Sequence, residues 1–451
     1  MRLVSSSTLG AVALVLSSLA GSFQPATAAT KTNVVLVLVD TLRADHLGLY
    51  GYERPTSPHL DRLAASGVVF ERGKSQAACT FISVSSLLTG HYPHRILKHT
   101  RGKLGVPDEH TSVAEILSKE GYETLAVTAS SVVRKTPGEF NEDGGYGKGF
   151  DTFDESCEKK PAACVTDKAI ELASKAERPF FLYLHYMDPH APYRPPDGYE
   201  RAFSAPASDA PPRNGDLRPY ARRLYKGGGK VARGPIARLA DAYDDEIRYW
   251  DGEFARLIED LRAKGLLEDT LLVLTADHGE DFLEHEDLGH CRTVHETSIH
   301  IPVLLWGPDI EPGRRVAAPI ENVDVLPTLL DLLEIDATNY ALDGSSVQGL
   351  ISGDPTGEEV AFASQGRLRS VNDRRYKLVY DVQSGERRLY DLESDPGETH
   401  DRANDLPAVF DRLSARLADH MRATEGKASK TRSLIRSEQM HNKLRALGYI
   451  E

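Results

Sequence analysis

Short apolar runs recur along the chain and predict buried strands. The first, at 33–40 (NVVLVLVD), is almost uninterrupted and rich in β-branched residues, which is typical of a strand buried on both faces of a sheet. Further runs of this kind begin at Val68 or span 124–129, 180–186, 270–277 and 301–307. The pattern therefore predicts a sheet with several fully buried strands.

Segments with helical spacing lie between these runs. A helix that begins at Thr56 or Ser57 is predicted to end before Gly67, and two more are predicted at 112–119 and 245–264. Strands that alternate with helices predict an α/β fold, in which a large, mostly parallel sheet lies between helices. Loops at the carboxyl ends of such strands usually form the binding crevice.

The chain becomes polar and rich in turns after about residue 344. Within this part, 376–381 and 388–392 resemble two antiparallel strands joined by a Ser-Gly turn. Two earlier segments, 132–149 and 195–234, break the alternation of strands and helices and are interpreted as surface loops. Part of one of these loops is a candidate wall of the substrate pocket.

The amino terminus has the features of a secretory signal. One basic residue precedes an apolar stretch at 9–20, and Ala-Thr-Ala at 26–28 predicts cleavage after residue 28. The apolar stretch is shorter than the roughly 20 residues that a membrane span requires. We expect an exported, periplasmic or extracellular protein with no transmembrane segment, made of a catalytic domain (29–343) and a C-terminal subdomain (344–451).

Charge and cysteine content narrow the classes of function. The formal net charge is −13, and a net acidic chain argues against general affinity for nucleic acid. Four cysteines are present, of which Cys157 and Cys164 bracket a short segment and predict a local disulfide in an oxidising compartment. Cys79 and Cys291 are either free thiols or a second pair.

Acidic residues end two of the predicted buried strands. Asp40 closes the first run, and Asp277, followed by His278, closes the run at 270–277. A carboxylate at such a position is costly to bury without a counter-charge, so the two strand ends indicate a shared cation. The alternative is that each aspartate caps a following helix. The sequence around both residues favours the metal site.

The ordered motifs carry a family resemblance. VLVLVDTLRADHLGLYGYERPTSPHLDRLAASGVVFE, SLLTGHYPHR, FLYLHYMDPHAPYRPP, TADHGEDFLEHEDLGH, IPVLLWGP, LYDLESDPGE and LRALGYI resemble, in order, the sulfatase family of the alkaline phosphatase superfamily. The resemblance implies a metal-dependent hydrolase with a large α/β domain and a small antiparallel subdomain. Asp40, Asp277 and His278 correspond to family metal ligands, whereas Thr41 replaces the second acid that usually follows the first strand.

The register of the motif before Gly90 decides which residue is the nucleophile. In the formylglycine sulfatases of the family that the chain resembles, the motif is Cys-x-Pro-Ser-Arg, followed by six residues that end in Thr-Gly. Counting back from Gly90 puts Thr80, and not Cys79, at the cysteine position. Ile82 and Val84 stand where the proline and the arginine would be. The register therefore argues against formylglycine.

Thr80 instead resembles the nucleophile of threonine-using members of the superfamily, which act mainly on phosphoryl groups. In those members the hydroxyl oxygen is bound to the metal, which lowers its pKa and orients it for in-line attack. Thr80 could also cap the following helix, and this role is compatible with both readings. The missing proline and basic residue support a catalytically weak or inactive protein as the alternative.

Two further motifs supply candidate substrate ligands. In DPHAPY, His190 matches the family histidine that faces the anionic ester, either as a proton donor or as an anion ligand, and Asp188 is a candidate to orient it. In DLGHCRTVHE, His290 matches the loop that often carries a sulfate-binding lysine, and His295 and Arg292 are weaker candidates.

The sequence leaves the metal and the substrate open. Carboxylates alone favour Ca²⁺ or Mg²⁺, whereas a histidine and a hydroxyl group admit Zn²⁺ or Mn²⁺. The main hypothesis is an exported hydrolase with one divalent metal ion that cleaves sulfate or phosphate esters of a small molecule or glycan, with Thr80 as the nucleophile. The alternative is an inactive member that binds an anionic glycan or lipid head group. A head-group transferase is a third reading, but such relatives usually carry several transmembrane helices.

Overall fold

The structure of the protein is a computed structural model. It describes residues 31–99, 103–159, 161–204, 215–226, 229–308, 310–353 and 359–425. The predicted signal peptide and the terminal LRALGYI motif lie outside these residues. Among the described helices, none combines the length and the apolar character that crossing a membrane would require.

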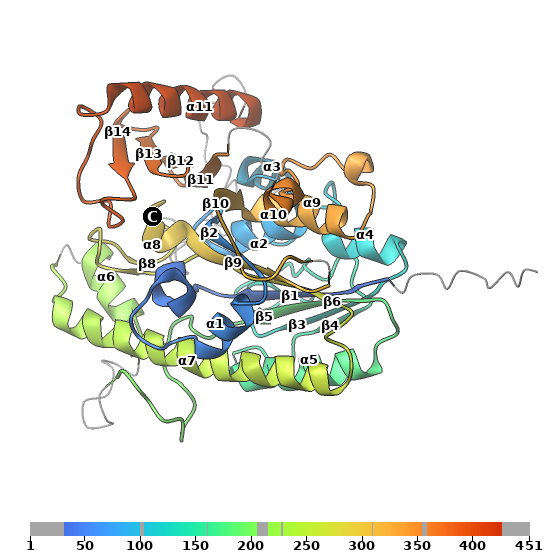
Figure 1. Cartoon of the computed structure of the whole chain (residues 1–451). Helices are drawn as coiled ribbons and strands as arrows, with labels where there is room; N and C mark the ends of the chain where they lie inside the picture. The colour runs from blue at the N-terminus through green and yellow to red at the C-terminus, as the bar shows by residue number, and fades with distance from the viewer. Residues whose placement is uncertain are drawn as a thin grey trace, which may run out of the picture. The chain divides into compact units, whose positions relative to one another are not determined.

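An eight-stranded sheet forms the centre of the molecule (Figure 1), with the order β10-β2-β9-β6-β1-β5-β3-β4. Its strands are β1 (Asn33–Val39), β2 (Val68–Lys74), β3 (Glu123–Thr128), β4 (Thr152–Asp154), β5 (Phe180–Tyr186), β6 (Thr270–Ala276), β9 (His300–Trp306) and β10 (Arg314–Glu321). Only β9 runs antiparallel to its neighbours, β2 and β6. The prediction of a large, mostly parallel sheet is confirmed.

Strand β1 lies in the middle of the sheet and is buried throughout, as its sequence predicts. It pairs in parallel with β5 on one side and with β6 on the other. Val35, Val37 and Val39 face one apolar core, and Val34, Leu36 and Leu38 face the other. A strand covered on both faces needs apolar residues at every position, which explains the uninterrupted run.

Helices cover both faces of the sheet (Figure 1). The first core is closed by α1 (Pro58–Ala64), α5 (Ala162–Lys175) and α7 (Arg233–Ala263). The second is closed by α2 (Thr80–Thr89), α4 (Val113–Lys119), α9 (Asn322–Leu332) and α10 (Gln348–Ser352). A short helix, α3 (Pro93–His99), follows α2.

The helix predicted at 245–264 is much longer in the structure. Helix α7 begins at Arg233, and α6 (Arg218–Lys226) also lies inside the segment interpreted as loop. Glycine, proline and arginine dominate that segment and hide its helical spacing. The loop at 132–149 contains no regular helix or strand, as expected.

The C-terminal part forms a separate antiparallel sheet. Its strands are β11 (Ala361–Gln365), β12 (Leu368–Asn372), β13 (Tyr376–Asp381) and β14 (Arg387–Asp391), in that order. The last two are the predicted antiparallel pair. Helix α11 (Pro407–Glu425) packs on one face of this sheet through Leu413 and Leu417. The segment from 344 to 353 packs with the large sheet, since Ile351 belongs to its second core.

The other face of the small sheet packs on the part of the chain that contains the large sheet. Ala363, Val379 and Tyr390 form one apolar cluster with Ala78, Val294 and Ile299. Beside this cluster, Lys377 of β13 lies 2.9 Å from Glu296 in α8 (Glu296–Ile299) and 2.9 Å from Glu398. Lys74 of β2 pairs with the same Glu296. The small sheet therefore rests directly on the segments that precede α2 and α8.

Candidate active site

Three of the residues predicted to bind metal meet at the carboxyl ends of two neighbouring strands. Asp40 follows β1, and Asp277 and His278 follow β6, its parallel neighbour. All three side chains are buried, and their candidate ligand atoms lie within 4.8 Å of one another. Neither aspartate caps a helix, because Arg43 is the cap residue after β1 and no helix follows β6 directly. The capping alternative is thus excluded.

Each aspartate keeps one carboxylate oxygen without a hydrogen-bond partner among the described residues, and that oxygen of Asp277 lies 3.3 Å from His278 Nε2. Asp277 Oδ1 accepts hydrogen bonds from the backbone N–H groups of Thr41, at 3.1 Å, and His278, at 2.8 Å. Asp40 Oδ1 and Asp277 Oδ2 are buried and have no hydrogen-bond partner among the described residues. Burial and the nearby Asp40 raise the pKa of Asp277 to about 7. Two buried carboxylate oxygens that lack a hydrogen-bond partner, on neighbouring aspartates, fit a bound cation.

His278 presents a nitrogen suited to the same cation. Its Nδ1 lies 2.9 Å from the carbonyl oxygen of Gly279, which fixes the proton on Nδ1 and leaves Nε2 without a proton. Burial, followed by the neighbouring His290, lowers the pKa of His278 to about 4, so the ring is neutral at pH 7. Two carboxylates and a neutral imidazole form a donor set that divalent metal ions accept.

Thr80 lies against this group at the start of α2. Its Oγ1 is 3.1 Å from His278 Nε2, and the side chain is buried. Thr80 is the first helical residue, whereas Cys79 is the cap residue, so the reading of Thr80 as the helix cap is wrong. Ser83, one turn further on, donates to the carbonyl oxygen of Asp277 at 2.6 Å. This bond joins the start of α2 to the end of β6.

Thr41 adopts an unusual backbone conformation next to Asp40. Its φ of 57° lies in the left-handed region, which β-branched residues rarely occupy. The hydroxyl group of Tyr243 donates to the Thr41 carbonyl oxygen at 2.7 Å and accepts from the N–H of Arg43 at 2.9 Å. These bonds, with the bond from Thr41 N–H to Asp277, hold the turn in place. At the position of the family's second acid, the chain therefore offers a hydroxyl group.

Two of the predicted substrate ligands, His190 and His290, lie beside the metal-binding group. The His290 ring is 4.7 Å from the His278 ring and 5.2 Å from the His190 ring. His290 Nδ1 pairs with Glu280 Oε1 at 2.9 Å. Burial lowers the pKa of His290, but the carboxylates of Glu280, Asp40 and Asp277 together outweigh burial and raise the pKa to about 9. His290 is therefore a partly buried cation at pH 7, suited to an anionic group.

Two other predicted substrate ligands have their contacts elsewhere. Asp188 is buried and hydrogen-bonds with Glu246 of α7, and burial raises the pKa of both carboxyl groups. The Nδ1 atom of His190 pairs with the carbonyl oxygen of Ala191, at 2.7 Å, instead of with Asp188. The Arg292 guanidinium group lies 3.5 Å above the ring of Tyr225 in α6.

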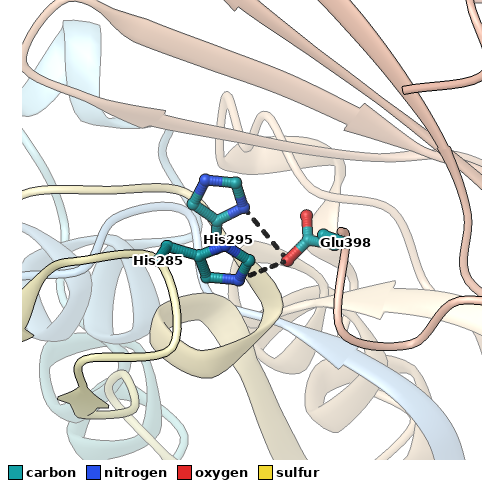
Figure 2. Close-up of side chains that lie close together, drawn as sticks. All are labelled: His285, His295 and Glu398. Carbon is teal, nitrogen blue, oxygen red and sulfur yellow. Dashed lines mark ion pairs between the residues drawn. The ribbon is translucent and has the colours of Figure 1, made fainter. Parts of the chain in front are cut away.

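His295 belongs to a second group, with His285 and Glu398 (Figure 2). The two rings stack at 3.7 Å, with an angle of 11° between their planes. Glu398 Oε2 lies 3.2 Å from His295 Nδ1 and 3.8 Å from His285 Nε2, and it accepts the N–H of Glu296 at 2.7 Å. The lone pairs of two parallel rings point side by side and do not converge on one metal ion. In addition, Lys377 already supplies a positive charge to Glu398. We interpret this group as a contact between the C-terminal part and the loop before α8.

Sequence reasoning missed His185, which contacts the metal-binding group. Its Nε2 lies 3.3 Å from Asp40 Oδ2, and its Nδ1 lies 3.0 Å from the hydroxyl group of Tyr183. If the tyrosine donates to Nδ1, the proton on Nε2 faces Asp40 and orients that carboxylate. The signal was a single histidine inside the apolar run FFLYLHY, where a buried polar residue needs a partner.

All four cysteines are paired in disulfides. Cys157 and Cys164 form the predicted local bridge, and Cys79 bonds to Cys291. Cys79 therefore has no free thiol that could be oxidised to formylglycine, in agreement with the register of the motif.

Comparison with known proteins shows which families the chain matches. The model of the family described as Sulfatase matches residues 32–335, and that described as N-sulphoglucosamine sulphohydrolase, C-terminal, matches residues 284–426. An arylsulfatase of Clostridium perfringens is 24% identical over 439 residues, covering 82% of this chain and 89% of that protein. A choline-sulfatase of Rhizobium meliloti is 28% identical over 281 residues, covering 59% and 54%.

Two solved structures share the fold. A phosphonate monoester hydrolase of Agrobacterium radiobacter has a TM-score of 0.69 at 20% identity, over 87% of this chain and 96% of that one. A protein solved in complex with its substrate, D-glucosamine-2-N,6-O-disulfate, has a TM-score of 0.70 at 17% identity, over 89% and 100%.

Proposed function

The chain belongs to the sulfatase family, and on this premise we propose that it is an ester hydrolase that uses Thr80 as its nucleophile and prefers phosphoryl to sulfuryl esters. Its relatives include an arylsulfatase and a choline-sulfatase, which are ester hydrolases. The observation that carries the finer proposal is the distance of 3.1 Å between Thr80 Oγ1 and His278 Nε2.

The choice of threonine favours phosphoryl transfer. In the first step the Thr80 hydroxyl group releases its proton to solvent water, a bond forms between Oγ1 and phosphorus, and the bond from phosphorus to the leaving oxygen breaks. Threonine has one oxygen on its Cβ, so the esterified residue cannot eliminate the anion as the two-oxygen formylglycine hydrate can. Water must therefore attack the phosphorus atom of the phosphothreonine to release phosphate and regenerate Thr80.

Asp40, Asp277, His278 and Thr80 are the residues that would hold the divalent metal ion of this family. When bound, such an ion lowers the pKa of a hydroxyl group and offsets negative charge on the substrate. His185 supports this arrangement, because it contacts the second oxygen of Asp40. A donor set that includes imidazole and hydroxyl favours Zn²⁺ or Mn²⁺ over Ca²⁺.

His290 and His190 supply the groups that face the ester. His290 carries a proton at pH 7 and would bind non-bridging oxygens of the substrate. His190 keeps its Nε2 available, since Nδ1 is occupied by the Ala191 carbonyl. From this position it would donate a proton to the leaving oxygen in the first step and take one from water in the second.

Export is part of the same proposal. Both disulfides support folding in an oxidising compartment, which for this chain would be the periplasm or the extracellular space. Cell fractionation, with a variant that lacks residues 1–28 as control, tests this point. Accumulation of the full chain in the cytoplasm would contradict it.

Turnover by purified protein loaded with Zn²⁺, Mn²⁺ or Ca²⁺ tests the reaction. The panel contains an aryl phosphate monoester, an aryl phosphonate monoester, a diaryl phosphate diester and an aryl sulfate. We expect phosphoryl or phosphonate turnover that falls by about a thousandfold or more in Thr80→Ala. The matched control is Thr89→Ala in the same helix, whose hydroxyl group donates to the Ser85 carbonyl oxygen.

Other outcomes separate the alternatives. Aryl sulfate as the best substrate, lost in Thr80→Ala, would keep the nucleophile and overturn the preference for phosphorus. Full activity in Thr80→Ala would overturn the nucleophile. No turnover of any ester, with retained binding of inorganic phosphate, would favour the inactive anion-binding protein.

A further inference from the structure

One disulfide connects the two sides of the proposed active site. Cys79 and Cys291 are 212 residues apart in the chain, and both are buried. Each is the immediate neighbour of a site residue, because Cys79 precedes Thr80 and Cys291 follows His290. The bond therefore links the residue before the nucleophile to the residue after the cationic histidine.

Backbone and side-chain contacts reinforce this link. The N–H of Cys291 donates to the carbonyl oxygen of Ala78 at 2.7 Å. Gln365, at the end of β11 in the small sheet, donates from Nε2 to the carbonyl oxygen of Cys291 at 2.8 Å. Ala78 and Val294 also share one apolar cluster with the small sheet. The strand-to-helix turn before Thr80 and the loop after His290 are thus held together at several points.

The backbone of Cys291 shows why the loop needs this restraint. Its φ of 67° lies in the left-handed region, which is unfavourable for any residue with a Cβ other than a few polar ones. Without a link the loop could relax toward an ordinary backbone conformation, and His290, one residue earlier, would move with it. The second disulfide offers a contrast, because Cys157 and Cys164 close a loop with a sequence separation of only 7.

We propose that the Cys79–Cys291 disulfide is a positioning element of the active site, which fixes the separation of the Thr80 hydroxyl group and the His290 ring. This inference rests on the proposed function. In-line transfer requires the nucleophile and the group that holds the ester to keep one geometry, and a displacement of about 1 Å can cost about a hundredfold in rate. Neither cysteine touches the substrate in this account, so both act through their neighbours.

The test compares two double variants that each lack one disulfide. C79A/C291A removes the proposed positioning link, and C157A/C164A is the matched control. Steady-state kinetics with the best ester of the panel are measured well below the melting temperature of both variants. We expect kcat to fall by about tenfold or more in C79A/C291A and to stay within about twofold in the control.

A purely structural bridge gives a different result. It would lower the melting temperature while kcat at low temperature stayed near the wild-type value, so a folded C79A/C291A with kcat within about twofold of wild type overturns the proposal. Should C79A/C291A fail to fold, C79A/C291G takes its place, because glycine adopts the left-handed conformation without penalty. Gln365→Ala loosens the same loop with the bridge intact, and a loss of kcat there also supports positioning.

A binding measurement keeps this inference separate from the proposed function. If wild type and control hydrolyse no ester, the reaction is wrong, but the positioning of His290 remains testable with inorganic phosphate in calorimetry. We then expect phosphate affinity to fall by about tenfold in C79A/C291A relative to C157A/C164A. Equal affinity in the two variants would overturn the positioning role.

Discussion

At the residue scale, two neighbouring histidines differ in charge because burial dominates the pKa of one and a carboxylate partner offsets burial in the other. The rings of His278 and His290 are 4.7 Å apart. Burial, followed by the neighbouring His290, lowers the pKa of His278 to about 4 and keeps it neutral, whereas His290 pairs with Glu280 and has a pKa of about 9, which keeps it protonated. One ring can then bind a metal ion while the other binds an anion.

Glu280 is expected to control the binding of an anion by His290. Replacing Glu280 with Gln keeps the size of the side chain but removes the charge that stabilises protonated His290. We expect KM for the anionic ester to rise by about tenfold, which corresponds to about 1.4 kcal/mol, with a smaller change in kcat. Glu286→Gln, at an exposed position of the same loop, should leave KM unchanged. An unchanged KM in Glu280→Gln would contradict this role of the carboxylate.

Metal content separates the two groups of histidine and carboxylate. Asp277→Asn removes a charge from the group of Asp40, Asp277 and His278, and we expect the purified protein to lose its stoichiometric divalent metal ion. His285→Gln, in the group with His295 and Glu398, should keep it. Elemental analysis of both variants provides the measurement. Metal lost from His285→Gln and retained in Asp277→Asn would reverse our assignment.

At the element scale, the contact between α2 and the end of β6 positions Thr80. Ser83→Ala removes the hydrogen bond from Ser83 to the carbonyl oxygen of Asp277. We expect a loss of about 1–2 kcal/mol in the free energy of unfolding, measured with urea, because the buried carbonyl loses its donor. The exposed Ser118→Ala in α4 should change stability by less than about 0.5 kcal/mol. Equal effects would mean that this bond does not hold α2 in place.

The elements differ in how well the sequence predicts them. Strands β1, β5 and β6 were predictable because burial on both faces demands uninterrupted apolar runs. Strand β10 was missed, since arginines and a proline interrupt its apolar residues at the sheet edge. The Cys157–Cys164 pair follows from close spacing, whereas no local pattern marks the Cys79–Cys291 pair. Contacts between distant segments, such as His185 with Asp40, depend on strand order, which single motifs do not encode.

At the scale of the whole molecule, buried ion pairs fasten the small sheet to the catalytic part. Glu398, completely buried, lies beside Lys377 of β13 and accepts the N–H of Glu296 in α8. Burial alone would raise the pKa of Glu398, but Lys377 and His295 lower it to about 2. Because the ordinary value is higher, the ionised carboxylate stabilises the fold above about pH 4.5. This stabilisation is lost as the pH falls toward 2.

Glu398→Gln imitates the protonated carboxyl group and isolates this contribution. At pH 7 we expect a loss of about 3 kcal/mol in the free energy of unfolding, from the shift of the Glu398 pKa. The difference from wild type should shrink between pH 4.5 and the lowest pH at which wild type folds. Glu393→Gln, an exposed residue, should cost less than about 0.5 kcal/mol at every pH. A constant difference for Glu398→Gln would show that its charge is not stabilising.

The most direct test of the account is to trap the covalent intermediate on Thr80. Metal-loaded protein is mixed with the aryl phosphate or phosphonate ester that it turns over fastest, quenched with acid during turnover, digested and analysed by mass spectrometry. We expect the transferred phosphoryl or phosphonyl group on the peptide that contains Thr80, and no label in Thr80→Ala. Label on another residue, or rapid turnover with no label and full activity in Thr80→Ala, would contradict the proposed nucleophile.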